Sequence, residues 1–172
     1  NCYAGNNRLF RILFMLSPVE ELKIQAKRLL KEPSFKAELR VLSKNRSPQL
    51  KHSQLFIARH YGFRDWEHAR LILSCEGYMP GADCGSFWYV NQCATLLNHW
   101  CASHQEALNV QLTLGGIILP YKAQFVVADR QYLDFLGMSY DDVLWQDIQH
   151  DWCLGPVVTR KKLALKRLVR KA

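Results

Sequence analysis

Cys101 and His104 are a closely spaced pair of soft metal-ligand side chains in this 172-residue chain. If one helix carries both, residues three apart share a face, and a thiolate beside an imidazole is the start of a zinc or copper site. The same pair could instead work as a nucleophile and its base. No CxxC pair completes a zinc site, so buried free thiols are the alternative to both. We expect no cofactor.

A second group of candidate ligands lies towards the C-terminus and combines carboxylates with an imidazole. Its members are Asp141, Asp142, Asp147, His150 and Asp151. Carboxylates suit a divalent cation, but the group lacks the alternating spacing of a cation-binding loop. Asp141 and Asp142 also suit the start of a helix, where negative charge meets the helix dipole. The sequence leaves both interpretations open.

The basic side chains predict contacts with nucleic acid. Residues 53–75 form two short helical patterns that meet at Gly62, which is typical of a helix-turn-helix pair. The second pattern would be the recognition helix, although Trp66 within it suits the core better than a groove of DNA. The candidate contacts are Lys51, Arg59, Arg64, His68, Arg70, Lys161 and Lys162.

Net charge changes sign along the chain in three blocks. Residues 1–75 hold 14 Lys and Arg against 6 Asp and Glu, residues 76–157 hold 2 against 9, and residues 158–172 hold 7 against none. The basic blocks could meet nucleic acid or an acidic protein. Alternatively, the acidic block neutralises them within the molecule or between subunits. The first interpretation requires Arg64 and Arg70 to be free of carboxylate partners.

These side chains depend on predicted helices in the first half of the chain. Ser17-Pro18-Val19-Glu20 is a capping box that begins a helix ending near Lys31. Further helices are expected from Ser34, over 55–61, and over 65–74 with Asp65 as the N-cap. Gly62 fits a left-handed helix end between the last two.

The second half of the chain predicts a core helix, a hairpin and short helices. Residues 86–100 are apolar on all sides, which is typical of a central helix. The other expected elements are a helix ending at Gly115-Gly116, strands over 117–120 and 124–127, and helices over 130–136, 139–148 and 157–172. Ser139 to Asp142 reads as a capping box. The last helix either binds an anionic partner or packs its Leu and Val stripe on the core with its cations in solvent.

The predicted fold class is therefore mainly α (α+β). We expect a basic helical subdomain over residues 1–75, and an acidic one over 76–172 with one short β-hairpin. No apolar run approaches ~18 residues, so no membrane-spanning helix is expected. The apolar stretch before Ser17 contains Arg11 and lacks a cleavage signature, which indicates a cytoplasmic protein with reduced thiols.

Part of the first half resembles a known helical module. The pattern LKxQAKRL at 22–29, followed by an apolar helix after Ser53, Gly62 and Arg64-Asp65-Trp66, is similar to an accessory segment of glyoxalase-superfamily proteins and uncharacterised bacterial proteins. It covers residues 19–75. Residues 85–156 more faintly resemble hypothetical proteins of plasmids and other mobile elements. Residues 76–172 offer no His and Glu set at strand spacing, so the resemblance implies no lyase or dioxygenase activity.

We therefore predict a non-enzymatic bacterial binding protein that engages nucleic acid or an acidic protein through residues 17–75 and 158–172. One alternative is a small-molecule or metal-binding protein or enzyme with a pocket in residues 84–153, lined by Trp100, Cys101 and His104. The other is a structural or interaction protein of a mobile element that forms homo-oligomers by pairing acidic and basic faces.

Overall fold

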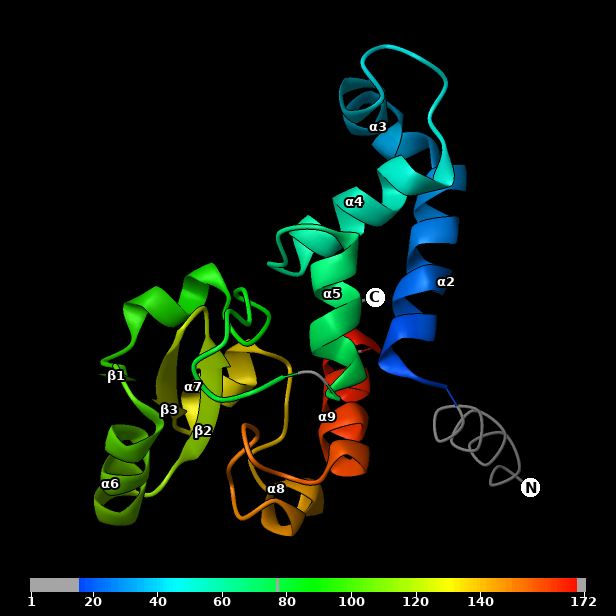
Figure 1. Cartoon of the computed structure of the whole chain (residues 1–172). Coiled ribbons are helices and arrows are strands. Elements are labelled where there is room, and N and C mark those ends of the chain that lie inside the picture. The colour runs from blue at the N-terminus through cyan, green and yellow to red at the C-terminus, as the bar shows by residue number, and fades with distance from the viewer. Residues whose placement is uncertain (1–15, 77, 170–172) are drawn as a thin grey trace, which may run out of the picture.

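The computed structural model describes residues 16–76 and 78–169. This part of the chain is mainly helical with a three-stranded antiparallel sheet, which confirms the predicted mainly α (α+β) class. In Figure 1 the first helices extend to one end of the molecule, the sheet lies at the other, and the last helix lies between them.

The N-terminal helices follow the predicted signals. Helix α2 (Pro18–Lys31) begins at the predicted capping box, in which Ser17 Oγ accepts from the Glu20 amide and the Glu20 carboxylate accepts from the Ser17 amide. A 3-10 turn, η1 (Pro33–Phe35), leads into α3 (Lys36–Leu42), and α4 (Leu50–His60) returns along α2. The contact between α2 and α4 buries the apolar face of α2.

The turn between α4 and α5 (Trp66–Ser74) joins the helices to the rest of the fold. Gly62 has φ +83°, as predicted, and the Phe63 amide donates to the Ala58 carbonyl at 2.9 Å to close the end of α4. A Cβ atom at Gly62 would lie 2.2 Å from Ser86 Oγ. The Ser86 amide in turn donates to the Gly62 carbonyl at 2.9 Å. Only glycine allows this close backbone contact.

The predicted core helix over 86–100 is wrong. That segment forms turns, a 3-10 helix η2 (Asn91–Thr95) and strand β1 (His99–Cys101). Trp88 is fully buried, whereas Leu97 is 93% exposed. The apolar residues therefore do not share one helical environment. Pairing with a free sheet edge satisfies the backbone of 99–101 instead.

Strands β2 (Ile117–Tyr121) and β3 (Gln124–Ala128) form the predicted hairpin, and β1 adds a third strand that the sequence did not reveal. The strand order is β1-β3-β2, with Val126 opposite Trp100 on one side and Leu119 on the other. Helix α6 (His104–Leu114) packs against the sheet and ends before Gly115, as predicted.

Three helices complete the part of the chain that the structure describes: α7 (Arg130–Phe135), α8 (Val143–Asp147) and α9 (Val157–Val169). The N-cap of α8 is Asp142, so the predicted capping box from Ser139 is wrong. Ser139 instead accepts a hydrogen bond through its carbonyl from Trp145 Nε1 at 3.0 Å. Helix α9 contacts α2, α5 and α8.

One contiguous apolar core runs from Leu22 in α2 to Leu168 in α9. Within it Trp88, Trp145 and Trp152 are each fully buried, and Trp88 meets each of the other two edge to face, a favourable arrangement for aromatic rings. The division into subdomains over 1–75 and 76–172 stays a prediction. None of the helices in the described part of the chain combines the length and apolar character that a membrane crossing requires.

Candidate functional site

The predicted recognition helix, α5, is well formed but poorly suited to a nucleic-acid groove. Asp65 caps it by accepting from the His68 amide at 2.8 Å. His68 is only 5% exposed, its Nδ1 accepts from the Arg64 amide and its Nε2 lies 2.9 Å from the Asp83 carbonyl. Burial and these two contacts give the His68 ring a structural role, because it joins α5 to the loop at Asp83, so we do not include His68 among the candidate contacts below.

The arginines of this region have carboxylate partners, contrary to the requirement stated above. Arg64 Nε lies 3.0 Å from Asp65, and Arg70 Nη1 lies 2.7 Å from Glu67. Both pairs are exposed, so each contributes little to stability, but each local positive charge is balanced. Neither arginine meets that requirement, so the interpretation in which both basic blocks act together on an anionic partner fails at α5, and only cations without carboxylate partners remain candidates.

The C-terminal basic helix is a structural element of the core. Arg160 is 7% exposed, donates to the Cys75 carbonyl at 2.8 Å and lies over the Trp152 ring. Lys161 pairs with Glu76 at 2.7 Å, and Lys166 pairs with Asp142. Lys162 is half-buried. The predicted packing of the apolar stripe is right, but the prediction that all the cations lie in solvent is wrong, because α9 is enclosed by α2, α5 and α8.

The remaining two predicted contacts, Lys51 and Arg59, are exposed on α4. They belong to a larger group that we call the arm cations, which lie on α2, α3, α4 and the connection 43–49. The arm cations are Lys23, Lys27, Arg28, Lys31, Lys36, Arg40, Lys44, Arg46, Lys51 and Arg59. All ten are exposed, and none forms a salt bridge with a described residue.

We call residues 16–60 the arm, and residues 61–76 and 78–169 the body. The arm holds ten Lys and Arg against four Glu, a net charge of +6. Two of these four carboxylates are engaged: Glu20 in the capping box of α2, and Glu21 with Gln25 at 2.9 Å. Figure 1 shows α3 at the end of the molecule farthest from the sheet, so the arm projects its charge away from the acidic body.

Cys101 and His104 do not share a helix face, as the metal-site hypothesis required. Cys101 ends β1, whereas His104 opens α6 with its Nε2 2.7 Å from the carboxylate of Asp151. Among the described residues no three His, Cys, Asp or Glu side chains are grouped to hold a metal ion. The pair therefore lacks further ligands, and His104 instead links α6 to residue 151.

The thiols are buried rather than activated. Burial, aided by Glu106, raises the pKa of Cys101, and burial raises the pKa of Cys75 to about 12. A nucleophilic cysteine needs the opposite shift, since the thiolate is the reactive form. The geometry supports the alternative of free thiols in the core.

The acidic group near the C-terminus is divided among different partners. Asp141 forms a two-contact pair with Arg130, Asp142 binds Lys166, and Asp151 binds His104. The Arg130 hydrogen bonds lower the pKa of Asp141. The hypothesis of a shared divalent-cation site is contradicted, because these carboxylates have separate partners and no three candidate ligands are grouped among the described residues.

Sequence reasoning located the arm cations only in part. The amphipathic pattern of α2 places its lysines on the polar face. The predicted nucleic-acid contacts, however, were chosen from the helix-turn-helix pattern, which pointed to α5. The informative signal was the local excess of cations over carboxylates between residues 23 and 59. Counting the Lys and Arg residues against the Asp and Glu residues within each predicted helix would have located this excess of cations.

Comparison with protein families, with curated protein sequences and with solved structures gives no match. The resemblance of residues 19–75 to a glyoxalase-associated module stays a prediction.

Proposed function

We propose that this protein binds nucleic acid through its arm, by contacts to phosphates rather than to bases. The observation that carries the proposal is the separation of charge: the ten arm cations are exposed without salt bridges, whereas the body pairs or buries most of its own. Lysine and arginine clusters neutralise phosphates and release counterions, which drives binding independently of sequence.

The spacing on α2 suits a phosphate backbone. Lys23, Lys27 and Lys31 follow one another at intervals of four residues and are all exposed. With ~1.5 Å of rise per residue they extend over about 12 Å of the helix axis. One DNA strand presents about three or four phosphates over that length. A row of like charges at this spacing weakens the isolated helix, so stability does not explain it.

The experiment compares two triple variants with the same change of net charge. The first is Lys23→Gln/Lys27→Gln/Lys31→Gln, which removes three arm cations. The second is Arg64→Gln/Arg70→Gln/Lys161→Gln, which removes three cations that already have carboxylate partners. Fluorescence anisotropy with an arbitrary DNA duplex is measured over a series of salt concentrations.

We expect wild-type binding to weaken steeply with salt, and the arm variant to lose affinity and flatten the log–log salt slope by roughly 2–3. The paired-cation variant should retain most of the affinity. Equal losses in both variants would show that only total charge matters. Absence of wild-type binding at low salt, with binding to polyglutamate instead, would favour an acidic protein partner and overturn the proposal.

Of the other two predicted functions, self-association has no comparable observation, and the pocket for a small molecule or metal has none on the residues first named as its lining. Trp100, Cys101 and His104 line neither of the two largest cavities described near the α4–α5 turn, of about 400 and 670 Å³.

A further inference from the structure

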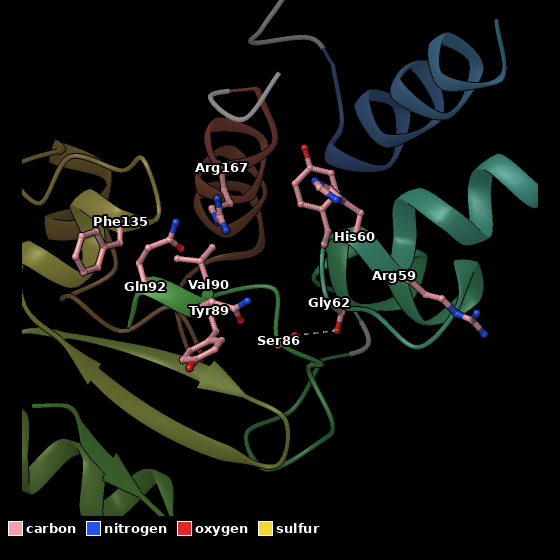
Figure 2. Close-up of a pocket in the computed structure, with 11 residues that line it drawn as sticks. Arg59, His60, Gly62, Ser86, Tyr89, Val90, Gln92, Phe135 and Arg167 are labelled. Carbon is pink, nitrogen blue, oxygen red and sulfur yellow. Dashed lines mark hydrogen bonds between the residues drawn. The ribbon is translucent and has the colours of Figure 1, made fainter. Parts of the chain in front are cut away.

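A cavity of about 400 Å³ lies beside the turn that joins the arm to the body. Its walls come from the end of α4, the segment 86–92, the end of α7 and the last turn of α9. Figure 2 shows Arg167 extending from α9 towards the segment that carries Val90 and Gln92. The volume lies within the range of small-molecule sites in proteins.

Arg167 is an unusual side chain for such a wall. It is only 1% exposed, its Nη1 donates to the Leu136 carbonyl at 2.9 Å, and its Nε has no acceptor among the described residues. Of the neighbouring cations on α9, Lys166 binds Asp142. Arg160 also lacks a described carboxylate partner, and its Nε and Nη1 have no acceptor among the described residues, but it lies over the Trp152 ring and lines none of the cavities described here. Arg167 has no salt bridge with a described carboxylate.

The charge of Arg167 therefore needs compensation from another source. The titratable groups that act on it electrostatically are Tyr61, Cys93 and Tyr132, and burial raises the pKa of all three, so they are neutral near pH 7. Burial lowers the pKa of Arg167, but a guanidinium remains charged. The C-terminal dipole of α9 supplies only about half an elementary charge. An unpaired buried cation is costly, and a bound anion would remove the cost.

The rest of the wall suits an anion. None of the eleven lining residues is an aspartate or glutamate. Asn91 and Gln92 bring amide donors, and Gln92 is turned towards Arg167 in Figure 2, whereas Arg59 at the rim points away. A guanidinium and side-chain amides together are a donor set for planar or tetrahedral oxyanions.

We propose that this cavity binds a small molecule through its phosphate or carboxylate group, with Arg167 as the fixed cation and Gln92 as a second donor. Arg59 is the one arm cation among the lining residues, and it lies at the rim. Arg167 and Gln92 are not arm cations, so the proposal does not rest on nucleic-acid binding. The hydrogen bond to the Leu136 carbonyl holds the Arg167 side chain at the wall of the cavity, so the guanidinium is already in place before an anion binds.

The test measures the melting temperature with inorganic phosphate, with citrate, and with sodium chloride at the same ionic strength. Phosphate or citrate at about 10 mM should raise Tm of the wild type by roughly 3–5 °C if the dissociation constant is about 1 mM. The preferred anion distinguishes a phosphate ligand from a carboxylate ligand. Calorimetric titration with the more effective anion should then give one site per chain.

Arg167→Met should abolish this rise without loss of fold, because replacing a buried unpaired cation by an apolar side chain of similar size is often neutral or stabilising. The matched control, Lys44→Gln, removes one exposed arm cation and should retain the rise. If Arg167→Met does not fold, Gln92→Leu is the second variant, because Gln92 is exposed and its replacement spares the core. We expect this variant to bind the anion about tenfold more weakly. An equal rise in sodium chloride, no rise in either anion, or a full rise in Arg167→Met would overturn the proposal.

Discussion

In the arm, Lys23 and Lys27 are exposed without salt bridges, whereas in the body Lys161 and Lys166 on α9 are bound by Glu76 and Asp142. The two helices have a similar lysine-rich composition. They differ in what surrounds them, because α9 is packed on several sides and α2 has one face in solvent. The comparison shows that a basic amphipathic pattern does not by itself indicate a binding surface.

The arm carries an energetic disadvantage that the body offsets with carboxylate partners. Like charges four residues apart on a helix are destabilising by about 0.2–0.5 kcal/mol per pair. In the body, the pairs Lys161–Glu76 and Lys166–Asp142 connect residues that lie far apart in the sequence. The arm contains few carboxylates to do the same, which is consistent with an external source of negative charge.

The largest expected effect concerns the core that arm and body share, and its measurement also tests whether the two regions unfold together. Trp152 is fully buried and contacts the rings of Trp88 and Tyr78. Trp152→Ala should destabilise the protein by about 3–5 kcal/mol, because it removes transfer free energy and leaves a cavity. Since one core spans both regions, urea unfolding followed by tryptophan fluorescence and by far-UV circular dichroism should give coincident transitions.

The control for that experiment is Val41→Ala, at a position that is 75% exposed on α3, and it should change stability by less than about 0.5 kcal/mol. Separate transitions for the two probes in wild type would mean that the arm is an independent unit. The arm and the body would then differ in their unfolding as well as in their charge.

The next effect tests the joint between the two regions. Gly62→Ala should cost about 2–3 kcal/mol, because φ is +83° and the new Cβ would collide with Ser86. Gly81→Ala is the matched control: φ is +88°, but nothing lies within 4 Å of its Cβ, so we expect about 1 kcal/mol. Equal losses of Tm in the two variants would show that conformation alone, and not the contact with residue 86, matters at the joint.

The fold was predictable where a local signal determines it. The capping box at Ser17, the left-handed Gly62 and the N-cap Asp65 act within a few residues, and each is present as expected. The segment 86–100 was not predictable in this way. Its backbone is determined by contacts with Gly62 and β3, and neither partner can be identified from apolar density alone.

The candidate sites show the same limit. Exposure of Lys51 and Arg59 follows from their place on an amphipathic helix and was predictable. The burial of His68 and of Arg167 was not, because it depends on which distant segments cover them. A buried arginine without a carboxylate has no signature in the sequence, so the cavity beside α9 could be found only in three dimensions.

A smaller effect concerns pH and belongs to the body, which holds all five described free cysteines. Burial raises the pKa of Cys75 to about 12, so the unfolded chain loses this proton first as pH rises. Stability should therefore fall above about pH 8.5, the usual pKa of an unfolded cysteine, and Cys75 alone should contribute about 1.4 kcal/mol of that loss one unit higher.

Urea unfolding of wild type and Cys75→Ala at about pH 7.5 and 9.5 checks this expectation. At about pH 7.5 the thiol is protonated in both the folded and the unfolded chain, so the difference between the two proteins there measures the cost of the cavity that the variant creates. The difference in free energy of unfolding between wild type and variant should shrink at the higher pH. A difference that does not change with pH would show that the thiol ionises in the folded protein.

The smallest expected effect concerns the arginines of α5 and distinguishes the two regions most directly. Arg70 is paired with Glu67 at the surface, so Arg70→Gln should change the free energy of unfolding by less than about 0.5 kcal/mol. DNA affinity at low salt should change less than in Lys44→Gln, which removes an arm cation without a salt bridge. If Arg70→Gln lost more affinity than Lys44→Gln, α5 would contact nucleic acid after all, and the assignment of binding to the arm would be wrong.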